Sequence, residues 1–106
     1  MSNLEIPEIN AIVIVHFHNP LIFEIIENSP DTPRVGKIVS KNSGVDCDQL
    51  TQVSGSLIKN EGGLVSLTVP NYKYPLDPMF RNSLGFCVFE NIPIDKILDI
   101  KIMGDH

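Results

Sequence analysis

Residues 9–17 read INAIVIVHF, an almost unbroken run of apolar and β-branched side chains. Successive side chains of a strand point to opposite faces, so Val13, Val15 and Phe17 share one face while Ile12 and Ile14 share the other. Both faces are apolar, which is typical of a strand that is covered on both sides. We therefore expect a central strand here. We expect it to end at Asn19-Pro20, because proline cannot donate a backbone hydrogen bond.

Shorter runs of the same kind follow along the chain, separated by Pro, Gly and Asn. Their alternation predicts further strands over residues 21–27, 34–40, 53–59, 64–69 and 85–90. The strands over residues 53–59 and 64–69 should form a hairpin around residues 60–63, which contain two glycines. After Pro93 the spacing predicts one turn of helix and then a last strand near residues 98–103.

This pattern predicts an all-β fold: an antiparallel sandwich, roll or small barrel of about six or seven short strands with at most one short helix. The alternative is an α+β fold. That fold requires the C-terminal tail, or the ambiguous residues 45–52, to form a true helix packed on the sheet.

The size and composition of the chain predict a single domain, residues 1–106. With 106 residues, of which 42% are hydrophobic and 20% charged, the chain can bury one core and lies far from the composition of disordered proteins. No stretch approaches the roughly 20 apolar residues that a membrane span needs. The acidic N-terminus does not match a secretory signal peptide, so we expect a cytoplasmic protein with no membrane contact.

The formal net charge of −5 argues against nucleic acid as a partner, because such binding depends on clustered Lys and Arg, and here these residues are scattered. The same charge suits a basic protein partner. The chain has two cysteines, Cys47 and Cys87, too few for a disulfide framework, so we expect reduced thiols.

One candidate metal site is present. His16 and His18 are two residues apart on a strand and so point to the same side, and Glu24 on the next expected strand is a third ligand of suitable type. The alternative is that the two histidines lie where a buried strand emerges, one partly packed and the other solvated. We favour this alternative and expect no cofactor.

No other motif indicates a reaction. The aspartates that flank Cys47 disfavour its thiolate, so we expect a solvated acidic turn there rather than a nucleophile. Cys87 lies between apolar residues and is expected in the core. No nucleophile elbow or phosphate-binding loop is present, so we do not expect an enzyme.

The proline-rich segment 70–78 and the residues after it form the second candidate site. Long loops in small domains often carry function, and this one holds both tyrosines of the chain. Its residue types are those enriched at protein interfaces, so the candidate partner-binding residues are Tyr72, Lys73, Tyr74, Asp77, Phe80 and Arg81. The alternative is that the tyrosines cap the open end of the sheet.

Two functions from different classes follow from this sequence. The first is a non-catalytic acidic protein-binding domain, such as an inhibitor, an immunity protein or an adaptor, which recognises a basic partner such as a toxin or nuclease through a sheet edge or the tyrosine loop. The second is a small barrel that acts as a metal-dependent enzyme or ligand binder through His16, His18 and Glu24. A homodimer that covers the apolar tail, residues 97–103, is a further expectation.

Overall fold

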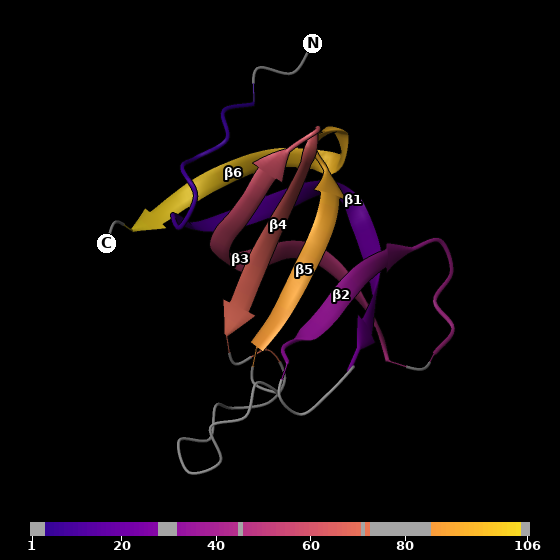
Figure 1. Ribbon diagram of the computed structural model, residues 1–106. Helices are drawn as coiled ribbons and strands as arrows, with labels where there is room; N and C mark the ends of the chain where they lie inside the picture. Colours follow the sequence, from indigo (N-terminus) through magenta and orange to yellow (C-terminus); the bar gives the residue numbers. More distant parts are fainter. Residues whose placement is uncertain (1–3, 28–31, 45, 71, 73–85, 105–106) are drawn as a thin grey trace.

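The computed structural model describes residues 4–27, 32–44, 46–70, 72 and 86–104. These residues form six strands and one short 3₁₀ helix (Figure 1). In chain order the elements are β1 (Ile12–Ile26), β2 (Arg34–Val39), β3 (Cys47–Glu61), β4 (Leu64–Pro70), β5 (Phe86–Pro93), η1 (Ile94–Lys96) and β6 (Ile97–Gly104). The predicted all-β class is confirmed, and the ambiguous residues 45–52 contribute the start of β3 rather than a helix.

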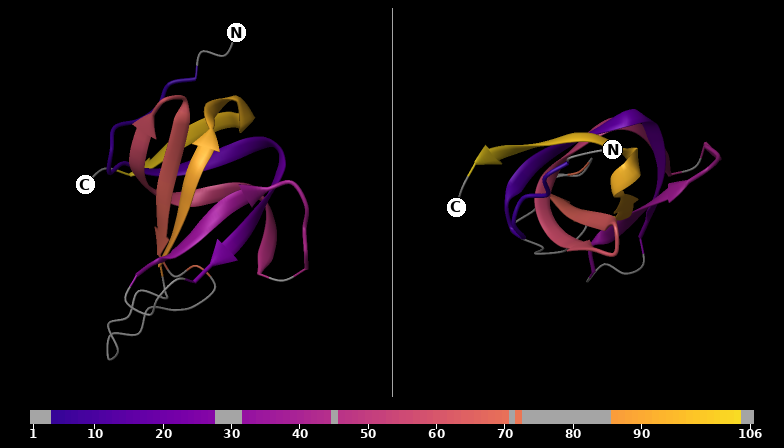
Figure 2. Two further views of the ribbon diagram at one scale, coloured as in Figure 1. Left: turned by 45° about the vertical axis from the view of Figure 1, so that its right-hand side comes forward. Right: turned by 90° about the horizontal axis from the view of Figure 1, so that it is seen from above.

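The strands form one sheet in the order β2-β5-β4-β3-β1-β6, and because β2 also pairs with β1, strands β1 to β5 form a closed ring. Seen from above, β1 to β5 surround a common interior, while β6 projects beyond the ring (Figure 2). The architecture is therefore a small barrel, one of the predicted forms. The sheet is mixed rather than purely antiparallel, because β2 and β5 pair in parallel, with Val35 opposite Val88.

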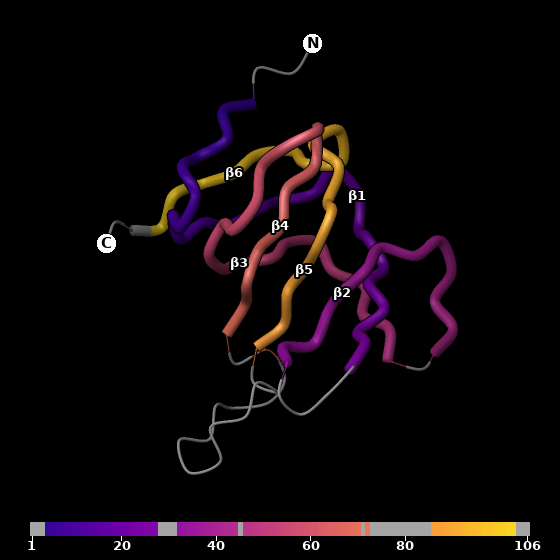
Figure 3. Tube along the Cα trace, viewed as in Figure 1, coloured from indigo at the N-terminus to yellow at the C-terminus, as the bar shows by residue number. Residues whose placement is uncertain are grey.

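β1 follows a long path through the sheet and takes part in both halves of the barrel (Figure 3). Its first half pairs with β6 and β3, and its second half pairs with β2 and β3. The prediction that Asn19-Pro20 ends this strand is wrong. Residues 17–20 of β1 lie opposite Thr51 alone of β3, so the proline sits in a bulge where no ladder hydrogen bond is required.

The core fills the interior of the barrel, and its buried apolar side chains come from the inward positions of every strand except β2. Val13, Val15 and Phe17 of β1 are almost fully buried, as their shared face predicts. The opposite face of β1 is not covered as expected, since Ile12 is 38% exposed and Ile14 is half-buried.

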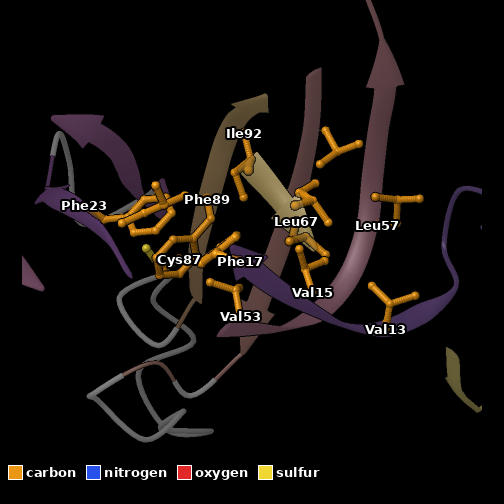
Figure 4. Packing of buried hydrophobic residues seen from close by; sticks show 13 residues of the cluster. Val13, Val15, Phe17, Phe23, Val53, Leu57, Leu67, Cys87, Phe89 and Ile92 are labelled. Atoms are coloured by element: carbon orange, nitrogen blue, oxygen red, sulfur yellow. The ribbon is translucent and has the colours of Figure 1, made fainter. Parts of the chain in front are cut away.

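Aromatic rings form one part of this core, where Phe17, Phe23 and Phe89 gather (Figure 4). Phe23 lies between Phe17 and Phe89, at centroid distances of 5.9 and 5.0 Å, and Tyr72 packs edge-on against Phe89 at 4.9 Å. Edge-to-face contacts of this kind add to the free energy gained from burial alone.

The hairpin and the end of the chain follow the sequence prediction closely. β3 and β4 are joined by Gly62-Gly63, with Glu61 opposite Leu64, and a 3₁₀ turn after Pro93 leads into β6. No helix in the described residues is long and apolar enough to cross a membrane.

Candidate functional site

A partly buried polar cluster lies at the end of the barrel where β2, β3 and β5 begin, at the bottom of Figure 1. Arg34 is only 4% exposed and donates a hydrogen bond to the backbone carbonyl of Tyr72. The Tyr72 hydroxyl donates to Oδ2 of Asp48 at 2.6 Å, and the Arg34 guanidinium lies 5.8 Å from the centre of the tyrosine ring. Charge, hydrogen bonds and ring contact therefore fix Tyr72 from three sides.

The surroundings of the cluster raise the pKa values of two groups, the Tyr72 phenol and the Cys87 thiol. Burial, followed by the hydrogen bond to Asp48, raises the pKa of Tyr72 well above its ordinary value. Burial also raises the pKa of the Cys87 thiol to about 11, although the nearby Arg34 opposes this rise. Both groups therefore keep their protons near neutral pH.

The cluster corrects one expectation and confirms another. Asp48 is half-buried and bonded to Tyr72, so the acidic turn around Cys47 is not simply solvated, although Asp46 is exposed. Cys87 is fully buried, as predicted, and both cysteines are free.

Of the six candidate partner-binding residues, the structure describes Tyr72. This residue packs against the core at the end of the barrel, as the capping alternative predicts for it. Lys73, Tyr74, Asp77, Phe80 and Arg81 lie outside the described residues.

The structure places His16 and His18 on the outer side of β1, flanking the buried Phe17. Nδ1 of His16 lies 2.8 Å from Oδ1 of Asp99 on β6, and His18 is exposed. Glu24 lies on the same strand rather than on a second one, beyond His18 by a strand length of roughly 20 Å at the usual rise per residue. The structure does not bring these three residues together. In the part of the chain that it describes, no three His, Cys, Asp or Glu side chains are grouped closely enough to hold a metal ion.

His18 instead lines a groove at the upper end of the barrel, with a volume of about 540 Å³. The groove lies between the turn that joins β3 to β4 and the 3₁₀ turn η1, and its lining residues are His18, Gly63, Pro93, Ile94, Asp95 and Ile97. The Ile94 amide donates to the Gly63 carbonyl at 2.9 Å, which ties the two turns together. An apolar floor is thus held between two exposed polar side chains, His18 and Asp95.

Sequence reasoning found His18 but not the groove. The other lining residues come from two turns that are distant in sequence and meet only because β4 pairs with both β3 and β5. The turn glycines and Pro93 were recognisable locally, but their proximity depends on that pairing.

Comparisons of this chain with protein family models, with curated proteins and with solved structures find no match.

Proposed function

We propose that this chain is a non-catalytic binding domain that recognises a basic protein partner, in the manner of an inhibitor, an immunity protein or an adaptor acting in the cytoplasm. The observation that carries the proposal is the groove between η1 and the β3–β4 turn. It combines a concave apolar floor with an exposed carboxylate, Asp95, on a short, tethered turn. Preorganised surfaces of this kind lose little entropy on binding.

The chemistry of the groove suits a lysine or arginine side chain of the partner. The aliphatic stem of such a residue can lie on Ile94 and Pro93 while its charged head reaches Asp95. The net charge of −5 supports the same partner, because opposite charge speeds the encounter of two proteins and disfavours acidic competitors.

The polar cluster at the lower end also supports a non-catalytic role. Its tyrosine and arginine are committed to contacts within the protein, and the pKa values of Tyr72 and Cys87 are raised by burial. These groups stabilise the end of the barrel and do not form a nucleophile with an adjacent base.

The test compares the wild-type chain with Asp95→Lys and Glu27→Lys as affinity baits in an extract of the native host. Glu27 is exposed and lies at the opposite end of the barrel, so the control has the same net charge as the groove variant. We expect a basic protein retained by the wild type and by Glu27→Lys, with its Kd raised about tenfold or more by Asp95→Lys. Added salt should slow its association.

Equal retention of the partner by all three baits would place its binding surface away from the groove. Retention of acidic proteins alone, or of a small molecule without a protein, would contradict the proposed class of partner.

A further inference from the structure

β6 leaves one edge of the sheet open. It is the terminal strand in the sheet order and pairs with β1 along one side, while no strand among the described residues pairs with its other side. It also projects beyond the ring formed by the other strands (Figure 2). An open edge presents unpaired backbone donors and acceptors that can accept another strand.

The open strand carries an unusual share of exposed apolar surface. Leu98, Ile102 and Met103 are 56%, 59% and 57% exposed, although all three lie within one eight-residue strand. Exposed apolar side chains next to unpaired backbone groups are typical of a surface that is covered by a partner strand.

The register with β1 shows which side chains of β6 share a face. Asp99 lies opposite His16 and Lys101 opposite Ile14, on the outer face of the sheet. Ile100 lies opposite Val15 and Ile102 opposite Val13, so these two isoleucines share the face of the core. Over residues 99–102 the strand therefore presents charges on one face and aliphatic side chains on the other, while Leu98 and Met103 lie at the two register shifts of the β1–β6 pairing.

This arrangement is complementary to itself. If two copies of β6 pair in antiparallel fashion about a twofold axis at Ile100, Asp99 of each copy faces Lys101 of the other. Shifting the axis to Asp99 or Lys101 would instead oppose two like charges, which is unfavourable.

We propose that the chain forms a homodimer in which β6 pairs with β6 of a second copy in this register, joining the two sheets into one. The proposal is independent of the proposed function, because it depends on residues 98–102 and not on the groove. The alternative role of Asp99 and Lys101 is to keep the edge unpaired, since charged residues protect many natural sheet edges. The experiment separates these two roles.

The test measures molar mass by sedimentation from micromolar to millimolar concentration. The wild type should dimerise, and Asp99→Lys and Lys101→Asp should each raise the dimer Kd about tenfold or more, because each opposes like charges in both symmetry-related pairs. An equimolar mixture of the two variants should restore dimers, since the doubly acidic β6 of one variant then faces the doubly basic β6 of the other. His16→Gln is the control, because it removes the contact between His16 and Asp99 while leaving the charges on β6.

A wild type that stays monomeric at all concentrations overturns the proposal and indicates edge protection. A dimer that is insensitive to both variants, or a mixture that does not restore it, also overturns it.

A disulfide cross-linking experiment tests the register directly. In this register only the residue on the twofold axis lies opposite the same residue of the second copy. Ile100→Cys should therefore form an intermolecular disulfide under mild oxidation, whereas Ile102→Cys should not. Both variants are made in a Cys47→Ser background. A cross-link at residue 102 alone would contradict the register. Circular dichroism of each variant confirms that it is folded.

Discussion

Tyr72 shows how one residue can hold the end of a small barrel. Its ring extends the aromatic packing of the core beyond Phe89, its hydroxyl is bonded to Asp48, and its backbone carbonyl accepts from the buried Arg34. A buried guanidinium is costly unless its donors are satisfied, and the tyrosine carbonyl satisfies one of them. The apolar and the polar contacts of the barrel end therefore meet at a single residue.

We expect Tyr72→Phe to lower the free energy of unfolding by about 1 kcal/mol, because it removes one partly buried hydrogen bond and keeps the ring on Phe89. Urea denaturation measures the effect as a shift of the midpoint at constant slope. The control is Ser54→Ala, which removes an exposed hydroxyl on β3 and should change stability by less than about 0.5 kcal/mol. Equal midpoints for Tyr72→Phe and the wild type would show that the bond to Asp48 does not stabilise the barrel.

The Cys87 thiol should lower the free energy of unfolding as the pH rises into the alkaline range. Its pKa in the folded chain is about 11, above an ordinary value of 9.0, so the unfolded thiol loses its proton first as the pH rises. Ionisation then favours the unfolded state, and stability falls between about pH 9 and pH 11, by an amount on the order of 2 kcal/mol. Tyr72, whose pKa is also raised, acts in the same direction at still higher pH.

Urea midpoints measured across this pH range test the effect of the thiol. Cys87→Ala should be less stable than the wild type at neutral pH because it leaves a small cavity, but it should lose less stability between pH 9 and 11. Parallel pH curves for the two proteins would assign the alkaline loss to other groups.

Among the elements, the β3–β4 hairpin depends on a special backbone conformation at its turn. Gly62 and Gly63 both have positive φ, 64° and 76°, the combination that a two-residue type I′ turn requires. Gly62→Asn should be tolerated because Asn adopts this conformation readily, whereas Gly62→Val should cost about 1–2 kcal/mol. Thermal denaturation of the Gly62→Asn and Gly62→Val variants measures the difference in their stability. Equal melting temperatures would indicate that the turn can adopt another form.

The strands could be predicted from alternation, but their neighbours could not. The hairpin has a strong local signal, whereas the spacing of the C-terminal tail also allowed a helix; the hairpin and the last strand are both confirmed. The continuity of β1 through Pro20 depends on a bulge against β3, and the parallel pairing of Val35 with Val88 joins segments more than fifty residues apart. Residue patterns specify faces and turns, whereas register is decided by packing across the whole barrel.

The candidate sites show the same division. Local spacing identified His16 and His18 as neighbours on one side of a strand, and loop composition indicated Tyr72 as a partner-binding residue or, alternatively, as a cap on the open end of the sheet. It could not reveal that Asp48 holds Tyr72 or that Asp95 shares a groove with His18, because these contacts exist only after the ring has closed.

For the whole molecule, the decisive event is the closure of the ring. β2 follows β1 directly in the sequence, yet it must also pair with β5, so residues 34–36 meet residues 87–89. Bringing such distant segments together has an entropic cost that local contacts cannot offset, and barrels rich in distant contacts fold in milliseconds to seconds. Cys87 lies in the closing pair and is fully buried, so its thiol becomes accessible only when these strands separate.

The reaction rates of the two thiols with a thiol reagent therefore give different information about the ring. Cys47, at the half-buried start of β3, should react quickly with a thiol reagent, whereas Cys87 should react slowly and at a rate that rises with urea as steeply as global unfolding does. The Cys47→Ser variant should lose the fast phase and keep the slow phase of Cys87 unchanged. Adding Phe89→Leu, which loosens the packing against Phe23 and Tyr72, should accelerate that phase by roughly tenfold, matching a loss of about 1.4 kcal/mol. A slow phase that does not respond to urea would mean that β2 and β5 separate locally while the rest of the barrel stays folded.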